Sequence, residues 1–305
     1  MTEEQRRPEG IGALVEAWRP RQWPKNLVVF AALVFSAEQA WTLDSPGSFW
    51  PLFWRTAALA VLWCFVSSAV YLVNDVCDRE ADRLHPRKAA RPIARGAVSP
   101  SLALVSAVLL AAAGVIGAAV LDLTAAAILA AYALAMAGYS LGLKAVPVLD
   151  ILLLSAGVVA RAVAGAAVID VTISPWLYVC TSFGALFLGV SKRWAEHRQL
   201  GAAAPGHRQS LGEYSGPTLE HMLTMSGAGA LLSYSLYTIE APTVPENGAM
   251  ALTLPFVVFG LFRYMLLITG RRAKDAPDQV LFTDSQIAIS VAGFLAVALG
   301  VLAWA

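Results

Sequence analysis

The chain has 305 residues, of which 58% are hydrophobic and 14% are charged. Because an ordinary soluble domain carries about 25% charged residues, this composition excludes a conventional soluble globule and indicates that most of the chain is a membrane domain. The formal net charge of +1 gives no field that attracts nucleic acid. The three cysteines form no CxxC pair, so we expect neither a disulfide framework nor a zinc site.

Residues 1–22 are the first predicted element, a polar segment that lacks the apolar core of a signal peptide. Ile11, Leu14, Val15 and Trp18 follow i, i+3, i+4, i+7 spacing, which predicts a short helix lying on the membrane surface. We therefore expect an N-terminal segment with one interfacial helix, followed by the membrane domain.

Nine apolar runs follow, each long enough or nearly long enough to cross the hydrocarbon core. They lie at about 26–40, 52–73, 101–121, 123–143, 147–169, 174–191, 218–239, 249–268 and 286–304. The first run is short, and we expect it to extend back through Trp23. The sequence thus predicts an all-α, polytopic protein whose nine-helix transmembrane domain covers residues 23–305, with no second domain.

Lys and Arg are unevenly distributed over the predicted connections. If the nine runs alternate across the membrane, 19 of the 22 basic residues lie on one side, and the other three, Arg55, Arg161 and Arg263, lie within runs. Basic residues are retained on the cytoplasmic side. We therefore expect a multi-pass protein of the cell membrane with a cytoplasmic N-terminus.

An acidic motif ends the second apolar run: Asn74, Asp75, Asp78 and Asp82 occur within NDVCDREADR. On a helix, at 100° per residue, the three aspartates lie within about 60° of one another. Hard oxygen ligands at this spacing suit Mg²⁺ bridged to phosphate oxygens, with Mn²⁺ as the alternative. An acidic helix end in solvent is the other interpretation, but carboxylates at a membrane boundary need compensation.

Basic residues near the predicted helix ends are candidates for binding an anionic substrate. Lys25 belongs to an N-terminal basic cluster, and prolines stiffen the loop that carries Lys88 and Arg91. Lys192 and Arg193 leave the sixth run together with Glu196 and could face the same cytoplasmic mouth. The alternative is that these residues follow the positive-inside rule or anchor the chain at the interface.

A further cluster contains Tyr139, Lys144, Asp150 and Arg161. Asp150 and Arg161 are nearly three helical turns apart and share a face. An intramembrane arginine indicates a functional site, and we expect its partner to be a phosphate. A structural ion pair with Asp150 through another helix remains the alternative.

The motifs NDxxDxxxD after the second run, RP about ten residues later and YSxGLK before the fifth run, together with nine spans, resemble the UbiA superfamily of intramembrane prenyltransferases. Within it, RPRQWPKN, NDVCDREADRLHP, YSLGLK and SKRWAE are most similar to the decaprenyl-phosphate phosphoribosyltransferase branch. The resemblance implies a UbiA-like helical bundle with a cytoplasmic-side active site. It also implies Mg²⁺-dependent transfer of 5-phosphoribosyl from 5-phosphoribosyl 1-diphosphate (PRPP) to a polyprenyl (decaprenyl) phosphate, for cell-wall arabinan synthesis.

One departure from the superfamily favours that branch. Ordinary members carry a second DxxxD motif on the fifth helix for a second metal, whereas here Asp150 is flanked at four residues by Val146 and Leu154. The implied roles are catalysis at Asn74, Asp75, Asp78 and Asp82, with the three aspartates binding the metal. The implied substrate-binding residues are Lys25, Lys88, Arg91, Tyr139, Lys144, Asp150, Arg161, Lys192, Arg193 and Glu196.

Two alternative functions remain at this point. One is a prenyltransferase that moves a prenyl group from prenyl diphosphate to an aromatic or other acceptor. The other is a transporter, which predicts ionisable residues in both leaflets, whereas the non-cytoplasmic half of the predicted spans has almost none. Small residues in the spans permit close helix packing within or between subunits, so a homo-oligomer such as a trimer stays open.

Overall fold

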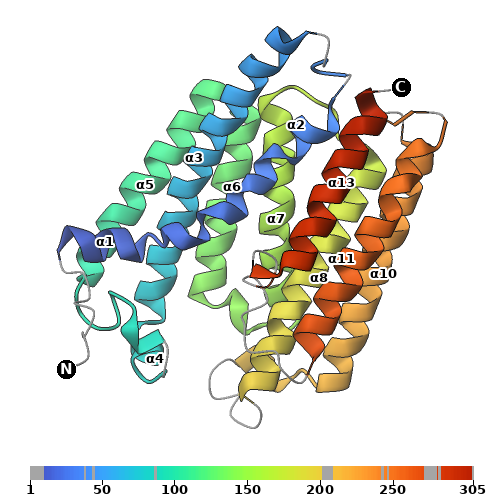
Figure 1. Cartoon of the computed structure of the whole chain (residues 1–305). Helices are drawn as coiled ribbons and strands as arrows, with labels where there is room; N and C mark the ends of the chain where they lie inside the picture. The colour runs from blue at the N-terminus through green and yellow to red at the C-terminus, as the bar shows by residue number, and fades with distance from the viewer. Residues whose placement is uncertain are drawn as a thin grey trace, which may run out of the picture.

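The computed structural model describes residues 10–37, 39–42, 45–85, 88–200, 209–241, 244–245, 247–270, 280 and 283–303. Within these residues the regular structure is helical apart from two isolated bridges. Eight long helices lie alongside one another (Figure 1). They are α3 (Pro46–Cys77), α5 (Pro100–Leu121), α6 (Leu123–Leu141), α7 (Leu149–Val168), α8 (Pro175–Leu200), α10 (Gly216–Glu240), α11 (Leu254–Thr269) and α13 (Ser285–Ala303). The predicted all-α class is confirmed.

Shorter elements lie before and between the long helices. They are α1 (Ile11–Ala17), η1 (Pro20–Phe30), α2 (Ala31–Phe35), α4 (Arg79–Arg83), η2 (Lys88–Ala90), η3 (Leu143–Ala145), η5 (Gln209–Gly212) and η6 (Ala249–Thr253). The predicted N-terminal helix is therefore present as α1, which packs Ala13 and Ala17 against a cluster that includes Leu72 and Ile93. Its place at a membrane surface stays a prediction.

The first predicted span differs from a regular transmembrane helix. Its described part is the 3-10 helix η1, with Pro24 inside it, followed by the five-residue helix α2. Pro24 has no backbone N–H and favours a break in α-helical hydrogen bonding. The two elements run obliquely to the long helices (Figure 1). The close approach of η1 to α7 depends on Gly165, because a Cβ there would lie 2.0 Å from the Val29 carbonyl oxygen.

Six helices in the described part of the chain are long and apolar enough to cross a membrane: α3, α5, α6, α7, α11 with η6, and α13. Helices α8 and α10 have 26 and 25 residues and fall short in apolarity. They pack on each other closely, since a Cβ at Gly229 would lie 2.6 Å from the Phe183 ring. The multi-pass architecture is thus supported, while the count of nine spans stays a prediction.

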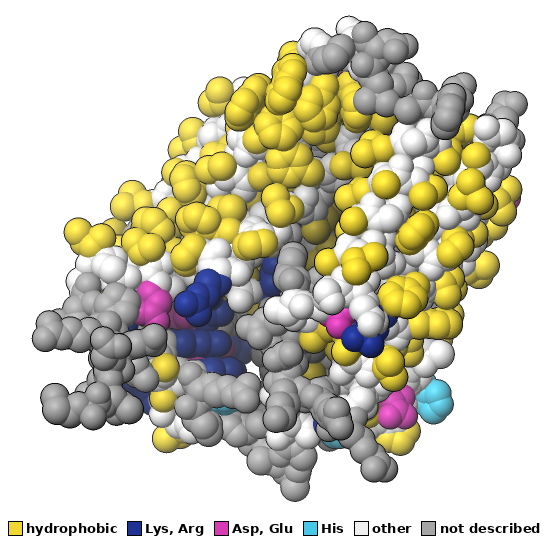
Figure 2. All heavy atoms as spheres, in the orientation of Figure 1, with side chains coloured by type: hydrophobic (Ala, Val, Ile, Leu, Met, Phe, Trp, Pro, Cys, Tyr) yellow, Lys and Arg dark blue, Asp and Glu magenta, His cyan; other side chains and the backbone are white. Residues whose placement is uncertain are grey.

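The C-terminal ends of α3, α6, α8 and α11 lie at one end of the bundle, at the bottom in Figure 1. Figure 2 shows Lys and Arg side chains in a hollow near this end, below a largely hydrophobic surface. The described basic residues of this end include Arg19, Arg79, Arg83, Lys88, Arg91, Arg95, Lys144, Lys192, Arg193 and Arg198. Arg6, Arg7, Arg87, Arg208, Arg271, Arg272 and Lys274 lie outside the described residues. The bundle therefore has one basic end, as the sequence predicts.

Candidate active site

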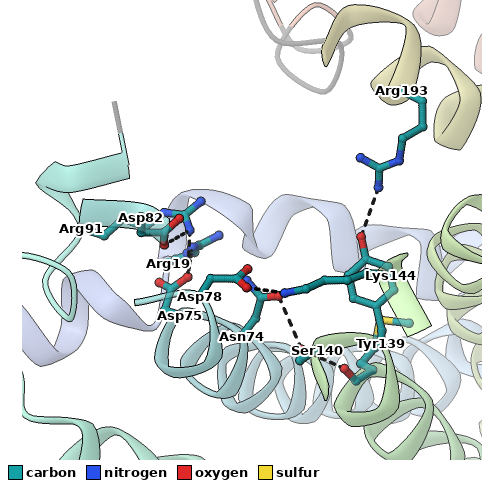
Figure 3. A network of polar contacts seen from close by, with 11 residues as sticks. Arg19, Asn74, Asp75, Asp78, Asp82, Arg91, Tyr139, Ser140, Lys144 and Arg193 are labelled. Atoms are coloured by element: carbon teal, nitrogen blue, oxygen red, sulfur yellow. Dashed lines mark hydrogen bonds and ion pairs between the residues drawn. The ribbon is translucent and has the colours of Figure 1, made fainter. Parts of the chain in front are cut away.

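The acidic motif lies at the basic end of the bundle, where α3 passes into α4. Helical hydrogen bonds continue across the junction, from Asp78 N–H to the Asn74 carbonyl (2.9 Å) and from Asp82 N–H to the Asp78 carbonyl (2.8 Å). Asp75 and Asp82 are buried, whereas Asn74 and Asp78 are half-buried. The continued helix keeps the three aspartates on successive turns, so their carboxylates are presented to the same part of the mouth (Figure 3).

Three cations neutralise these carboxylates. The Arg91 guanidinium lies 3.1 Å from Asp75 Oδ1 and 2.5 Å from Asp82 Oδ2, and Arg19 forms a second ion pair with Asp75. Lys144, from η3, pairs with Asp78. Buried carboxylates are stable only when paired and hydrogen-bonded, so these contacts explain how the acidic motif can lie beside an apolar helix.

A second polar network adjoins the first. The Ser140 hydroxyl on α6 lies 3.5 Å from Asn74 Oδ1, and the neighbouring Tyr139 hydroxyl accepts a hydrogen bond of 3.1 Å from Arg193 on α8 (Figure 3). Arg193 pairs through Nε with Asp150 Oδ2 at 2.7 Å, and both side chains are fully buried. The ends of α3, α6, α7 and α8 are therefore joined by polar side chains at one mouth.

The model of the UbiA prenyltransferase family matches residues 27–286. The chain belongs to this family. It is 32% identical over 288 residues to the decaprenyl-phosphate phosphoribosyltransferase of Mycolicibacterium smegmatis, covering 92% of this chain and 89% of that protein. It is 33% identical over 290 residues to the protein of the same name from Corynebacterium glutamicum, covering 90% and 82%.

A solved structure supports the fold assignment. A UbiA homologue from Archaeoglobus fulgidus, bound to GPP and Mg²⁺, has a TM-score of 0.72 and 17% identity to this chain, and the match covers 95% of this chain and 99% of that one. At this identity the likeness shows the fold alone. The predicted UbiA-like helical bundle is confirmed.

The partners of Asp150 on α7 decide one alternative that the sequence left open for this UbiA family member. Asp150 has no exposed surface and pairs with Arg193, whereas the described partners of Arg161 are neutral groups, so the alternative of an ion pair between Asp150 and Arg161 is ruled out. Asp150 also accepts hydrogen bonds from the hydroxyls of Tyr214 (2.8 Å) and Ser210 (3.2 Å). A carboxylate so enclosed holds these side chains in place, while the contact of Asp150 with substrate stays a prediction.

Arg161 lies among neutral groups. Its Nε donates to Asn26 Oδ1 at 2.7 Å and one terminal nitrogen donates to the Gly157 carbonyl at 2.5 Å. The other terminal nitrogen lies 3.2 Å from the Tyr132 hydroxyl, and the guanidinium lies over the Trp63 and Tyr132 rings, 4.8 and 5.0 Å from their centroids. These contacts tie η1 to α3, α6 and α7. The described partners of Arg161 are protein groups, so the expected phosphate contact stays an untested prediction.

The remaining predicted site residues of this UbiA family member differ in exposure. Lys25 and Lys88 are half-buried, and Lys192 is exposed. Glu196 pairs with Arg193 instead of standing alone at the mouth. The structure therefore joins Glu196 to the second network, while the substrate contacts of the three lysines stay predictions.

Sequence reasoning missed Arg19, Ser210 and Tyr214. Arg19 adopts left-handed backbone (φ 57°) directly before Pro20 and stacks 4.9 Å from the centre of the Tyr71 ring. The position of Arg19, a basic residue between the predicted surface helix and the first apolar run, could have indicated a role at the site. Ser210 and Tyr214 belong to no recognisable motif, and only the tertiary structure brings them to Asp150.

The donor set at the acidic motif suits a divalent metal ion chemically. Asp75 Oδ2 is buried and has no hydrogen-bond partner in the described structure, so this oxygen is available to a ligand. No three His, Cys, Asp or Glu side chains among the described residues converge closely enough to hold a metal as they stand. Arg19, Arg91 and Lys144 already contact the same carboxylates, so these cations and a metal ion would compete for the oxygens.

Burial also alters the acidity of the motif. Desolvation raises the pKa of the Asp82 carboxyl above its ordinary value, while the charges of Arg91 and Lys88 oppose this shift. A raised pKa means that the neutral acid is easier to form than in a solvated aspartate. Metal binding by Asp82 requires the carboxylate, so acidic pH should weaken it.

Proposed function

We propose that this protein transfers the 5-phosphoribosyl group from PRPP to a polyprenyl phosphate such as decaprenyl phosphate, releasing diphosphate. The names of the relatives that are 32–33% identical over about nine-tenths of the chain support this activity. The structural observation that carries the proposal is the buried Asp150–Arg193 pair. It leaves α7 without an available carboxylate for a second metal and puts a cation there instead, which suits a donor rich in phosphate groups.

Asp75, Asp78 and Asp82 would hold a divalent cation, Mg²⁺ or alternatively Mn²⁺, assisted by Asn74. The Mg²⁺ and GPP bound to the Archaeoglobus fulgidus homologue support divalent metal use in this fold. When bound, the metal would neutralise charge on the departing diphosphate. Released from the carboxylates, Arg91, Arg19 and Lys144 would contact phosphate oxygens of PRPP, since charge-assisted hydrogen bonds to phosphate are strong and directional.

The reaction needs orientation more than proton transfer. A phosphate oxygen of the lipid attacks ribose C1 while the bond from C1 to the diphosphate oxygen breaks, so the new C1–O bond replaces the old one with inversion. The attacking oxygen is already anionic, and no strong general base is required. The contribution of the protein is to position the two substrates and to stabilise the charge of the leaving group.

An apolar pocket in the same bundle suits an isoprenoid segment of the lipid substrate. It lies between α2, α7 and α8, and its lining residues include Phe35, Val163, Leu177 and Tyr178. Such a lining suits a polyprenyl chain, which gains free energy when its apolar surface leaves water. The lipid phosphate would then lie toward the polar mouth.

Product analysis tests the proposed activity. Purified protein is incubated with labelled PRPP, decaprenyl phosphate and Mg²⁺, and the lipid product is identified by mass spectrometry. We expect polyprenylphosphoryl-5-phosphoribose. The family name and the GPP-bound neighbour favour prenyl transfer as the second candidate. A parallel incubation with prenyl diphosphate and 4-hydroxybenzoate covers this alternative, and a prenylated aromatic without a phosphoribosyl lipid would replace the proposal.

The proposed orientation puts the mouth and the N-terminus on the cytoplasmic side of the cell membrane, as the Lys and Arg bias supports. Cys77 is exposed beside Asp78, whereas Cys64 and Cys180 are half-buried. A membrane-impermeant maleimide should label Cys77 in inverted vesicles and leave it unlabelled in right-side-out vesicles. Cys77→Ser is the control, and labelling only in right-side-out vesicles would reverse the orientation.

A further inference from the structure

The connection between η3 and α7 contains a strained turn at Val148. Its backbone dihedral angles are φ 67° and ψ −47°, and the Leu149 N–H donates to the Pro147 carbonyl at 2.8 Å. This is the γ-turn of positive φ, which is rare and costly, the more so for a β-branched residue. Such backbone persists only where surrounding contacts determine it.

Tyr214 supplies those contacts. Its hydroxyl accepts a hydrogen bond from the Val148 N–H (2.5 Å) and donates one to Asp150 Oδ1 (2.8 Å), and the side chain is 5% exposed. Burial raises the pKa of Tyr214 to about 12, so the hydroxyl keeps its proton and remains a donor. Ser210, fully buried in η5, adds a hydrogen bond of 3.2 Å to Asp150 Oδ2.

The two partners of Tyr214 lead to two cations at the mouth. Val148 follows η3, which carries Lys144, the partner of Asp78. Asp150 holds Arg193, whose other end reaches the Tyr139 hydroxyl. One hydroxyl is therefore bonded both to the turn that follows Lys144 and to the carboxylate that orients Arg193, although it lies outside the mouth itself.

We propose that Tyr214, assisted by Ser210, is a positioning residue that holds Lys144 and Arg193 in place for a diphosphate-bearing donor. This inference rests on the proposed function of the mouth. Removing the Tyr214 hydroxyl removes its hydrogen bonds to the Val148 N–H and to Asp150 Oδ1, and the loss of buried hydrogen bonds in a shared network affects every member. The ring that packs in the core is retained in phenylalanine, so the loss is confined to the hydrogen bonds.

The test compares Tyr214→Phe with Tyr234→Phe. Tyr234 is also buried and shares one hydroxyl hydrogen bond, of 2.6 Å with Thr253, at the other end of the bundle. For Tyr214→Phe we expect KM for PRPP to rise at least fivefold, with KM for the lipid phosphate within twofold of wild type. Tyr234→Phe should leave both values within twofold, although both variants lower the thermal unfolding temperature. A fivefold change corresponds to about 1 kcal/mol, the usual scale of one hydrogen bond.

A double-mutant cycle tests whether Tyr214 acts through Asp150. In an Asp150→Asn background, Tyr214→Phe should raise KM for PRPP by a smaller factor than in wild type, because only the contact with the Val148 N–H is then left to lose. Ser210→Ala is the milder variant should Tyr214→Phe fold poorly, and we expect a two- to threefold rise. Unchanged KM in Tyr214→Phe or in a well-folded Ser210→Ala, additive effects in the cycle, or an equal effect of Tyr234→Phe would overturn the assignment.

A binding measurement separates this inference from the proposed function. The affinity of the purified variants for inorganic diphosphate with Mg²⁺ is measured by calorimetry, which needs no turnover. A loss of at least fivefold in Tyr214→Phe alone supports the positioning role even if wild type uses prenyl diphosphate and not PRPP. Equal affinity in wild type and Tyr214→Phe refutes the role whichever donor is used.

Discussion

Asp75 and Asp78 carry different partners at the same mouth, and both are needed if a divalent ion binds there. We expect Asp75→Asn and Asp78→Asn each to lower turnover on the order of 100-fold or more, because each removes a charged ligand and keeps the side-chain volume. The measurement is product formation over a range of Mg²⁺ concentrations, with circular dichroism to check folding. Near-normal turnover at ordinary Mg²⁺ in either variant would contradict the metal assignment.

Arg161 and Lys144 have different surroundings in the structure, although the sequence predicts that both bind substrate. Arg161→Met removes the partner of Asn26 and the Gly157 carbonyl. We expect it to lower the free energy of unfolding by about 2 to 4 kcal/mol, seen as a lower thermal unfolding temperature. Arg161→Lys should rescue little, since an ammonium cannot reproduce the planar fork.

Lys144→Met is the matched variant at the mouth, where the side chain is 19% exposed and pairs with Asp78. Here we expect a raised KM for PRPP with a small change in unfolding temperature. If the two variants changed KM and unfolding temperature to the same extent, the distinction between a structural and a substrate-binding cation would be wrong.

At the scale of elements, η1 depends on one glycine. A Cβ on residue 165 would collide with the Val29 backbone, whereas a Cβ on Gly184 of α8 would meet nothing within 4 Å. We expect Gly165→Ala to destabilise the protein by at least about 1 to 3 kcal/mol. The cost is high because the added Cβ would meet backbone atoms and not a side chain that can move. Gly184→Ala should change stability by less than about 0.5 kcal/mol. Thermal unfolding of both variants in the same detergent checks the two predictions. Equal unfolding temperatures for the two variants would contradict them.

The start of α13 offers a test of pH dependence. Asp284 accepts hydrogen bonds from the N–H groups of Gln286 and Ile287 and pairs with Arg263 of α11 at 2.8 Å. The Arg263 guanidinium holds the pKa of the Asp284 carboxyl below its ordinary value. The contact therefore stabilises the fold above the unfolded-state pKa and loses this effect as pH falls through the lower, folded-state value.

We accordingly expect wild type to unfold at a temperature higher than Asp284→Asn by about 2 °C at pH 7, the modest scale of a half-buried ion pair close to the surface. The difference should shrink as the pH is lowered from about 5 to 3, because the wild-type carboxyl then becomes neutral as well. A difference that grew on acidification would show that the sign of the shift is wrong.

For the molecule as a whole, composition and hydropathy predict the helical class and the positions of most long helices, because lipid-facing helices must be apolar along their length. The one-sided distribution of Lys and Arg also predicts the basic end. Hydropathy does not reveal the 3-10 geometry of η1, which follows from Pro24 and from packing at Gly165. The apolar run there indicates burial but not hydrogen-bonding pattern.

The candidate site is only partly predictable from the sequence, because some of its contacts are local and others join distant segments. The stripe of three aspartates follows from local helical spacing, which one segment contains. The pairing of Asp150 with Arg193 and the contact of Tyr214 join segments that are 43 and 64 residues apart. Which side chains Asp150 contacts depends on how α7, α8 and α10 are arranged. No local sequence pattern encodes that arrangement.

The ion pairs of the acidic motif have a consequence for how the protein is made. Because Arg19, Arg91 and Lys144 neutralise the three aspartates, a newly inserted chain can complete its fold before any metal reaches it. Chelation with EDTA should therefore abolish turnover and shift the unfolding temperature by less than about 2 °C, unlike a metal-dependent fold. A collapse of the unfolding temperature on chelation would contradict this. A cell short of the divalent ion would then accumulate intact, inactive protein that regains activity as soon as the ion returns.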